Sequence, residues 1–240
     1  MNILSLDSTA EVSTVALCSD QRLIAEMTLN TGNTHSQTLL PIVEQILKIS
    51  ETSLDDVDIF ACSTGPGSFT GVRIGAATLK GLAYGKDRPC VSVSTLEALA
   101  YNLIGFDGII CPVMNARRSQ VYNALFECKN SRITRLCPDR ALSIDELDRS
   151  LAEEFPNEKI YLCGDGYSIT ERGFKLTSIS QVPERLRYAS AYSVACCAIE
   201  KYRCGESLTD ATIAPIYLRP SQAERERNER LGLDNNENNK

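Results

Sequence analysis

The chain has 240 residues and a formal net charge of −6, with 31 Asp or Glu against 25 Lys or Arg. An acidic chain is poorly suited to hold nucleic acid through its own phosphate contacts, so we expect any link to RNA to be indirect. No segment approaches the ~20 apolar residues of a membrane-spanning helix, and no basic region precedes an apolar stretch at the N-terminus. Ten cysteines without a C-x-x-C pair are expected to be small buried hydrophobes. These features predict a cytoplasmic protein with no membrane association.

The first half of the chain begins with three strand-like runs and continues with alternating helices and strands. Strands are expected at about 2–7, 12–18 and 22–29, with Ser19-Asp20-Gln21 as a turn of an antiparallel meander. The pattern then predicts a helix at 35–49, a strand at 58–63, a helix after a glycine-rich loop, a strand at 90–93 and a helix near 95–104. Ser94 and Glu97 are predicted to form a capping box. This order predicts a ribonuclease H-like lobe over residues 1–105.

The second half begins the same order again. Strands are expected at 108–114, 120–127, 132–137 and 159–163, with helices at 144–154 and near 191–203. Ser143 and Glu146 predict another capping box, and Gly205 the end of the last helix. We therefore expect an α/β protein with a second, reduced ribonuclease H-like lobe over 106–220. Two such lobes are typical of the actin, sugar kinase and Hsp70 superfamily. Residues 221–240, rich in Glu, Arg and Asn, are expected to form a frayed helix or a disordered tail.

In that superfamily a nucleotide lies in the cleft between the lobes. The candidate nucleotide-binding residues are therefore two short turns, Asp7, Ser8 and Thr9 in the first lobe and Gly164, Asp165 and Gly166 in the second. Asp7 could also orient water or magnesium, because hard cations prefer carboxylate oxygens.

A glycine-rich segment, 64–75, joins a short apolar run to a helix that contains unusually small residues. Gly65, Gly67 and Gly71 are spaced G-x-G-x-x-x-G, which is neither a Walker loop nor the Rossmann fingerprint. Several glycines in one helix cost about 0.5–1 kcal/mol each relative to alanine, so close packing must compensate. Two explanations are open: the helix packs tightly on its own sheet, or Gly71 and Gly75 face the helix of a partner.

This segment resembles the signature of the TsaB (YeaZ-like) family of tRNA threonylcarbamoyladenosine biosynthesis proteins. Further similarities, in the order of the family, are Ile3-Leu4-Ser5-Leu6-Asp7-Ser8-Thr9, His35-Ser36-Gln37-Thr38-Leu39-Leu40-Pro41, Ser92-Val93-Ser94-Thr95-Leu96-Glu97-Ala98-Leu99, Ala116-Arg117-Arg118 with Val121-Tyr122, and Ala214-Pro215-Ile216-Tyr217-Leu218-Arg219. The resemblance implies a non-catalytic partner of TsaD, the enzyme that transfers a threonylcarbamoyl group to N6 of the adenosine 3′ of the anticodon. It also implies TsaE as a further partner and a homodimer when the chain is alone.

In this family the first two helices meet the equivalent helices of TsaD. The expected partner interface is therefore His35, Leu39, Leu40, Val43, Leu47, Gly71, Arg73, Gly75, Ala76, Thr78 and Leu79. No cofactor of its own is expected, although ATP or ADP could bind at the interface of the complex.

The side chains available for catalysis are few. His35 is the single histidine, so the chain lacks the histidine pair with which TsaD holds its metal, and no catalytic or metal-binding residues are expected. Asn115 replaces the Asp of the family's Asp-Ala-Arg, and an amide cannot act as a base. The alternative from another class is an active ATP-dependent phosphotransferase. Co-purification with a two-histidine paralogue would favour the partner protein, and turnover of ATP would favour the enzyme.

Overall fold

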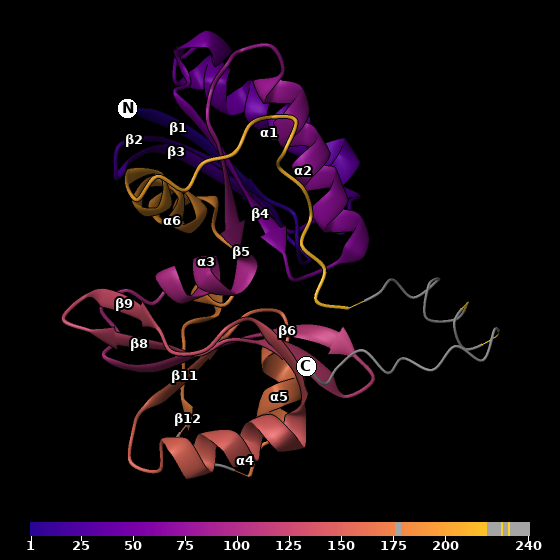
Figure 1. The fold of residues 1–240 in the computed structure, drawn as a ribbon, viewed down its shortest axis with the longest axis vertical. Helices are drawn as coiled ribbons and strands as arrows, with labels where there is room; N and C mark the ends of the chain where they lie inside the picture. Colours follow the sequence, from indigo (N-terminus) through magenta and orange to yellow (C-terminus); the bar gives the residue numbers. More distant parts are fainter. Residues whose placement is uncertain (176–178, 220–226, 228–229, 231–240) are drawn as a thin grey trace.

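Two mixed sheets, one above the other in Figure 1, form the framework of the chain. The structure is a computed structural model that describes residues 1–175, 179–219, 227 and 230. The tail predicted for 221–240 lies outside the described residues except at 227 and 230. No helix in the described ranges is both long and apolar enough to cross a membrane.

The first sheet has five strands in the order β3-β2-β1-β4-β5. Their bounds are β1 Asn2–Asp7, β2 Ser13–Ser19, β3 Arg22–Leu29, β4 Ile59–Gly65 and β5 Cys90–Ser94. β1, β2 and β3 form the predicted antiparallel meander, and β4 and β5 add in parallel to β1. This is the sheet of a ribonuclease H-like lobe, so the prediction for the first lobe is confirmed.

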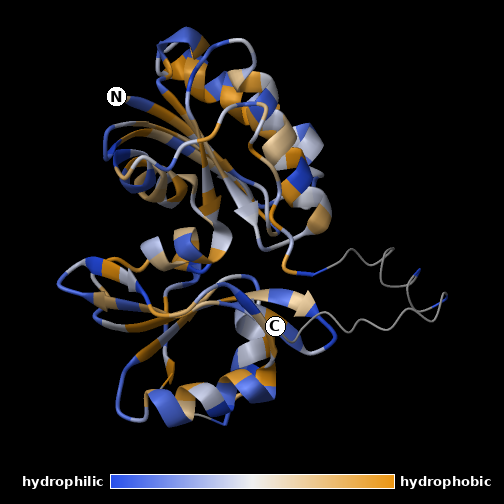
Figure 2. Cartoon of the chain, viewed as in Figure 1, coloured by the Kyte–Doolittle hydropathy of each residue, from blue (hydrophilic) through white to orange (hydrophobic). Residues whose placement is uncertain are grey.

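Two helices, α1 (His35–Ile49) and α2 (Phe69–Ala83), cover one face of this sheet. The apolar stripe of α1 recurs at Leu39, Val43 and Ile46, the spacing of one helix face, and all three side chains are buried against β1, β2 and β4 residues. Figure 2 shows apolar residues concentrated along the strands that these helices cover.

The other face of the first sheet is covered by α6 (Ala191–Arg203), which comes from the end of the chain. Its buried Ala191, Val194 and Ala198 pack against residues of β1, β2, β4 and β5. The sequence analysis placed this helix in the second lobe, and the structure corrects that placement. The predicted boundary between the lobes after residue 105 therefore holds only up to the start of α6, where the chain returns to the first lobe.

The second sheet has the order β10-β7-β6-β11-β12, with β8 paired to β6 and β9 paired to β8. Its strands are β6 Gly108–Arg117, β7 Gln120–Asn123, β8 Phe126–Lys129, β9 Arg132–Arg135, β10 Arg140–Ser143, β11 Ile160–Cys163 and β12 Ile179–Ser180. The helices of this lobe are α4 (Ile144–Glu154) and α5 (Tyr167–Gly173), and single 3-10 turns lie at Leu54–Asp56 and Glu184–Leu186.

The single strand predicted at 120–127 is two strands, β7 and β8. Both run antiparallel to β6, with Asn123 opposite Val113 and Phe126 opposite Ile110. The side chain of Asn123 donates to the carbonyls of Pro112 and Ala124 at the break, at 3.0 and 2.9 Å. β10, β12 and α5 were not predicted, since they are short and partly exposed.

Helix α3 (Thr95–Tyr101) lies between the two sheets. Leu96 and Leu99 pack with the second sheet, and Ala98 packs with the first. The capping box predicted at its start is only half formed. Ser94 Oγ accepts from the Glu97 N–H at 3.4 Å, but the Glu97 carboxylate faces Arg135 at 3.6 Å instead of the Ser94 N–H. The box of Ser143 and Glu146 is confirmed, with both hydrogen bonds present.

Candidate functional site

The glycine-rich loop connects β4 to α2 and is attached to the turn after β1. The Ser68 N–H donates to the Thr9 carbonyl at 2.7 Å, and Ser68 Oγ caps α2 by accepting from the Gly71 N–H at 3.3 Å. A Cβ on Gly67 would lie 2.4 Å from the Thr9 carbonyl oxygen. The loop therefore needs its small residues because the chain's own backbone lies against it.

The two glycines at the start of α2 face the same turn. A Cβ on Gly71 would lie 2.0 Å from the Ser8 carbonyl oxygen, and one on Gly75 would lie 2.7 Å from Ser8 Oγ. Ser8 is buried and donates from its hydroxyl to the Gly71 carbonyl at 2.9 Å. This corrects the interpretation that Gly71 and Gly75 face a partner helix: packing of α2 on its own sheet accounts for both.

The predicted partner residues separate into buried and accessible groups. The buried ones, which belong to the chain's own interior, are Leu39, Val43, Gly71, Gly75, Ala76 and Leu79. The accessible ones are Leu40 and Arg73, which are exposed, and His35, Leu47 and Thr78, which are half-buried.

Other residues that the sequence analysis did not select complete an accessible surface on the two helices. Ile49 and Tyr84 are 66% and 80% exposed, and Leu40 is 48% exposed. Ala77 is exposed too, and a Cβ on Gly81 would meet no atom within 4 Å. We call this surface the exposed α1–α2 face; its members are Leu40, Arg73, Ala77, Gly81 and Tyr84, whereas Ile49 lies half a turn around α1 from Leu40 and outside this face. Large apolar side chains beside small residues are what close contact with another helix requires.

Residues 204–219, the C-terminal strap, return across the first lobe and border this face (Figure 1). Leu208 pairs with Cys90, Ile213 is buried in the first core, and the Ile216 N–H donates to the Thr64 carbonyl at 2.8 Å. The strap carries the Ala214–Arg219 motif that the sequence analysis quoted only as a family similarity.

The strap and α2 together form an aromatic and cationic cluster. The Tyr217 ring stacks on Phe69 with centroids 4.5 Å apart, and Arg73 Nε donates to the Tyr217 hydroxyl at 2.8 Å. The guanidinium carbon of Arg73 lies 3.9 Å from the Phe69 ring centroid. Arg73, a member of the exposed α1–α2 face, is thus held by Phe69 and by Tyr217, which is 144 positions away from it in sequence.

His35 is held by two neutral partners. Its Nε2 lies 2.9 Å from the Ala10 carbonyl, to which it donates, and its Nδ1 lies 2.7 Å from the Ser13 hydroxyl. Both ring nitrogens are therefore occupied by hydrogen bonds that fix the start of α1.

Asp7, at the end of β1, is completely buried. Its Oδ1 accepts from the Thr9 N–H and hydroxyl at 2.8 and 2.9 Å, and Oδ2 has no partner in the part of the chain that is described. Burial is the largest effect on this carboxyl and raises its pKa.

Asp165 occupies the corresponding turn of the second lobe. Its Oδ1 accepts from the Asn115 N–H at 2.9 Å, and burial raises its pKa to about 6. A Cβ on Gly164 would lie 2.2 Å from the Val113 carbonyl oxygen, so this glycine too is required by packing within its own lobe. The Asn115 amide oxygen accepts from the Arg117 N–H at 2.8 Å. An Asp at this position could accept the same hydrogen bond, but it would place a second carboxylate beside Asp165.

The two turns face each other between the lobes, close enough for the Asp7 and Asp165 carboxyls to interact electrostatically. The remaining space near Asp165 is about 10 Å³, bounded by residues that include Thr95, Met114 and Arg187. A small-molecule site is on the order of several hundred Å³. Nucleotide binding by these six residues stays a prediction. Among the described residues, no three His, Cys, Asp or Glu side chains gather in a group that could hold a metal ion.

The paired sheets, each a meander extended by parallel strands, define a two-lobed ribonuclease H-like protein of the actin, sugar kinase and Hsp70 superfamily. A family model described as "TsaD: tRNA N6-adenosine threonylcarbamoyltransferase" matches residues 23–225. The chain belongs to the TsaB branch of this group, the YeaZ-like family.

The relatives named TsaB, tRNA threonylcarbamoyladenosine biosynthesis protein, include those of Bacillus subtilis (strain 168) and Escherichia coli (strain K12). The first is 36% identical over 154 residues, 64% of this chain and 67% of the relative. The second is 29% identical over 225 residues, 93% of this chain and 96% of the relative. The solved structure of YeaZ from Pseudomonas aeruginosa superposes with a TM-score of 0.76 at 25% identity, covering 90% of this chain and 99% of that one.

Proposed function

We propose that the chain acts in tRNA threonylcarbamoyladenosine biosynthesis as the non-catalytic partner of TsaD. In this role it supports transfer of the threonylcarbamoyl group to N6 of the adenosine 3′ of the anticodon, in tRNAs that read codons beginning with adenine. Family membership and the biosynthetic name of relatives that align over 93% of the chain support the pathway.

The observation that carries the partner role is the exposed α1–α2 face. Leu40 and Tyr84 expose large apolar surface, while Ala77 and Gly81 leave room for the backbone of another helix to approach. The cluster of Arg73 and Tyr217 at its border supplies the residue types that dominate binding energy in interfaces, already fixed in place. In this proposal TsaD covers this face, and a second copy of the chain covers it when TsaD is absent.

In this proposal TsaD, not this chain, carries out the transfer of the threonylcarbamoyl group. His35 is engaged at the start of α1, and Asp7 is buried with its preferred charge state shifted toward the neutral acid. ATP or ADP would then bind at the interface of the complex, TsaE would join the assembly, and tRNA would be held by the partners rather than by this acidic chain.

The test compares two leucine substitutions on α2. Gly81→Leu adds a side chain to open surface, so the variant should fold but lose its complex with TsaD. Gly75→Leu is the matched interior change and should reduce solubility or unfold the chain, because its Cβ meets Ser8. Size-exclusion chromatography with light scattering gives the stoichiometry. A Gly81→Leu chain that still forms the complex would place the interface elsewhere.

The alternative function, an ATP-dependent phosphotransferase, is tested by the same preparations. Steady-state ATP turnover with magnesium by the chain alone, abolished by Asp7→Asn, would replace the partner proposal with the enzyme.

A further inference from the structure

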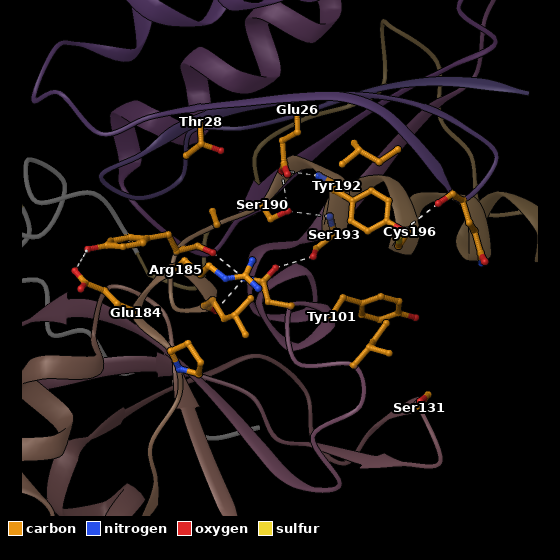
Figure 3. Close-up of a pocket in the computed structure, with 18 of the residues that line it drawn as sticks. Glu26, Thr28, Tyr101, Ser131, Glu184, Arg185, Ser190, Tyr192, Ser193 and Cys196 are labelled. Carbon is orange, nitrogen blue, oxygen red and sulfur yellow. Dashed lines mark hydrogen bonds between the residues drawn. The ribbon is translucent and has the colours of Figure 1, made fainter.

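A groove of about 1290 Å³ runs along β3, on the side of the first sheet that α6 covers (Figure 3). Its walls come from β3, the end of α3, residues 183–190 and α6, and none of its lining residues belongs to α1 or α2. We call it the β3 groove; the side chains that matter here are Glu26, Tyr101, Glu184, Tyr188, Tyr192 and Glu200.

One wall of the β3 groove is the outermost strand of the first sheet, which lines the groove with side chains on its α6-facing side. β3 is the outermost strand of the first sheet and pairs only with β2 among the described residues. The lining residues Gln21, Leu23, Glu26 and Thr28 follow the strand, a length of about 23 Å at ~3.3 Å per residue. A free edge of this length presents unpaired backbone donors and acceptors to which an extended segment can add as a further strand.

The other elements that line the groove carry three tyrosines whose hydroxyl groups are already fixed. Tyr101 donates to Glu200 at 2.5 Å, and Tyr188 donates to Glu184 at 3.2 Å. Tyr192 donates to the Gln21 carbonyl at 2.9 Å. Rings held in this way offer rigid contact surface at little cost in side-chain entropy.

The charge of the β3 groove is negative. Its lining residues include three exposed carboxylates, Glu26, Glu184 and Glu200, and one cation, Arg185. In Figure 3 the Glu26 carboxylate reaches from the strand to Ser190 and Tyr192, to which its Oε1 is bonded at 2.8 and 3.0 Å. In the described part of the chain, the other oxygen of each carboxylate takes part in no hydrogen bond or ion pair.

These features define the chemistry of a ligand. Carboxylates beside tyrosine rings attract lysine and arginine side chains through charge-assisted hydrogen bonds and cation–π contact. The volume exceeds the usual range of a small-molecule pocket, about 300–1,000 Å³, which favours a polymer segment. The negative charge disfavours nucleic acid.

We propose that the β3 groove binds an extended, lysine- or arginine-bearing segment of a partner protein, which adds to the free edge of β3. The chain can then hold two partners together, because this groove and the exposed α1–α2 face lie on opposite faces of the first sheet (Figure 1).

The test uses a fluorescein-labelled octapeptide of alternating lysine and threonine, with an octapeptide of alternating glutamate and threonine as the control. Fluorescence anisotropy with the purified full chain should show binding of the first peptide only. The double variant Glu184→Gln, Glu200→Gln should weaken binding about tenfold or more. The matched double variant Glu153→Gln, Glu158→Gln, at exposed positions outside the groove, makes the same charge change and should stay within roughly twofold.

Three outcomes would overturn the proposal: equal weakening by the two double variants, equal binding of the glutamate peptide, or no binding at millimolar lysine peptide. Two further measurements test whether the peptide adds to β3 as a strand. A lysine peptide methylated on alternate backbone nitrogens loses the donors that β3 would accept and should not bind. NMR amide shifts of 22–29 should move with the unmodified peptide, and shifts confined to other residues would reject this site. Because TsaD is absent from these assays, their result is independent of the proposed partner role.

Discussion

Asp165→Asn should make the chain more stable near neutral pH and leave it little changed in acid. The folded pKa of Asp165 is raised from 3.8 to about 6 by burial, so the folded state favours the protonated acid. A group whose folded pKa is raised contributes its full stability below the unfolded pKa and loses it as the pH rises through the folded pKa. The loss for Asp165 therefore develops between about pH 4 and pH 6.

The magnitude follows from the size of the shift. About two pKa units at ~1.4 kcal/mol each give roughly 3 kcal/mol at pH 7, an upper estimate because the side chain retains some contact with water. An Asn at this position cannot ionise, and its amide oxygen can still accept from the Asn115 N–H. We expect the variant to gain about 1–3 kcal/mol at pH 7.

Urea unfolding of the two proteins, measured at intervals from pH 4 to pH 8, provides the assay. The difference between the variant and the native chain removes the titration of all other groups. It should grow as the pH rises to about 6 and then become constant. A difference that does not depend on pH, or a variant that is less stable at pH 7, would refute this account of Asp165.

Three further predictions concern α2, the strap and the cell. Gly75→Ala should lower the free energy of unfolding by about 1 kcal/mol, because the added Cβ displaces the Ser8 hydroxyl from the Gly71 carbonyl. Gly81→Ala should raise the free energy of unfolding by about as much, because its Cβ meets no other atom. Thermal unfolding measures both, and a Gly75→Ala chain more stable than Gly81→Ala would contradict this packing. Tyr217→Phe removes the hydroxyl that fixes Arg73, so calorimetry should show TsaD binding weakened by about 1 kcal/mol or more, and unchanged affinity would exclude the strap from the interface. In cells depleted of the protein, Asp7→Asn should restore the threonylcarbamoyl nucleoside detected by mass spectrometry and Gly81→Leu should not; the opposite pattern would favour catalysis at Asp7.

Much of the framework could be predicted from local sequence. The positions of the meander, of α1 and of α2 follow from apolar residues repeating every 2 or every 3.6 positions. This repeat appears whenever one face of a strand or helix is buried, whatever layer covers that face. Short elements such as β10 and α5 carry too few residues for a period to be read, and the break between β7 and β8 depends on hydrogen bonds of Asn123 to two backbone carbonyls. Of the predicted interface residues, Leu40 and Arg73 are exposed, and the interface itself stays a prediction.

The sequence by itself determined the family, through the resemblance of the glycine-rich loop and of the other quoted segments to the family's motifs, and it determined which residues of each helix share a face. Only the tertiary structure decided what each face meets. Gly75 faces Ser8 while Gly81 stays open, α6 returns to the first sheet, and the strap brings Tyr217 to Arg73. These outcomes depend on contacts between segments far apart in the chain. A local pattern does not contain them, because a small or apolar side chain packs equally well against an internal neighbour and against a partner protein.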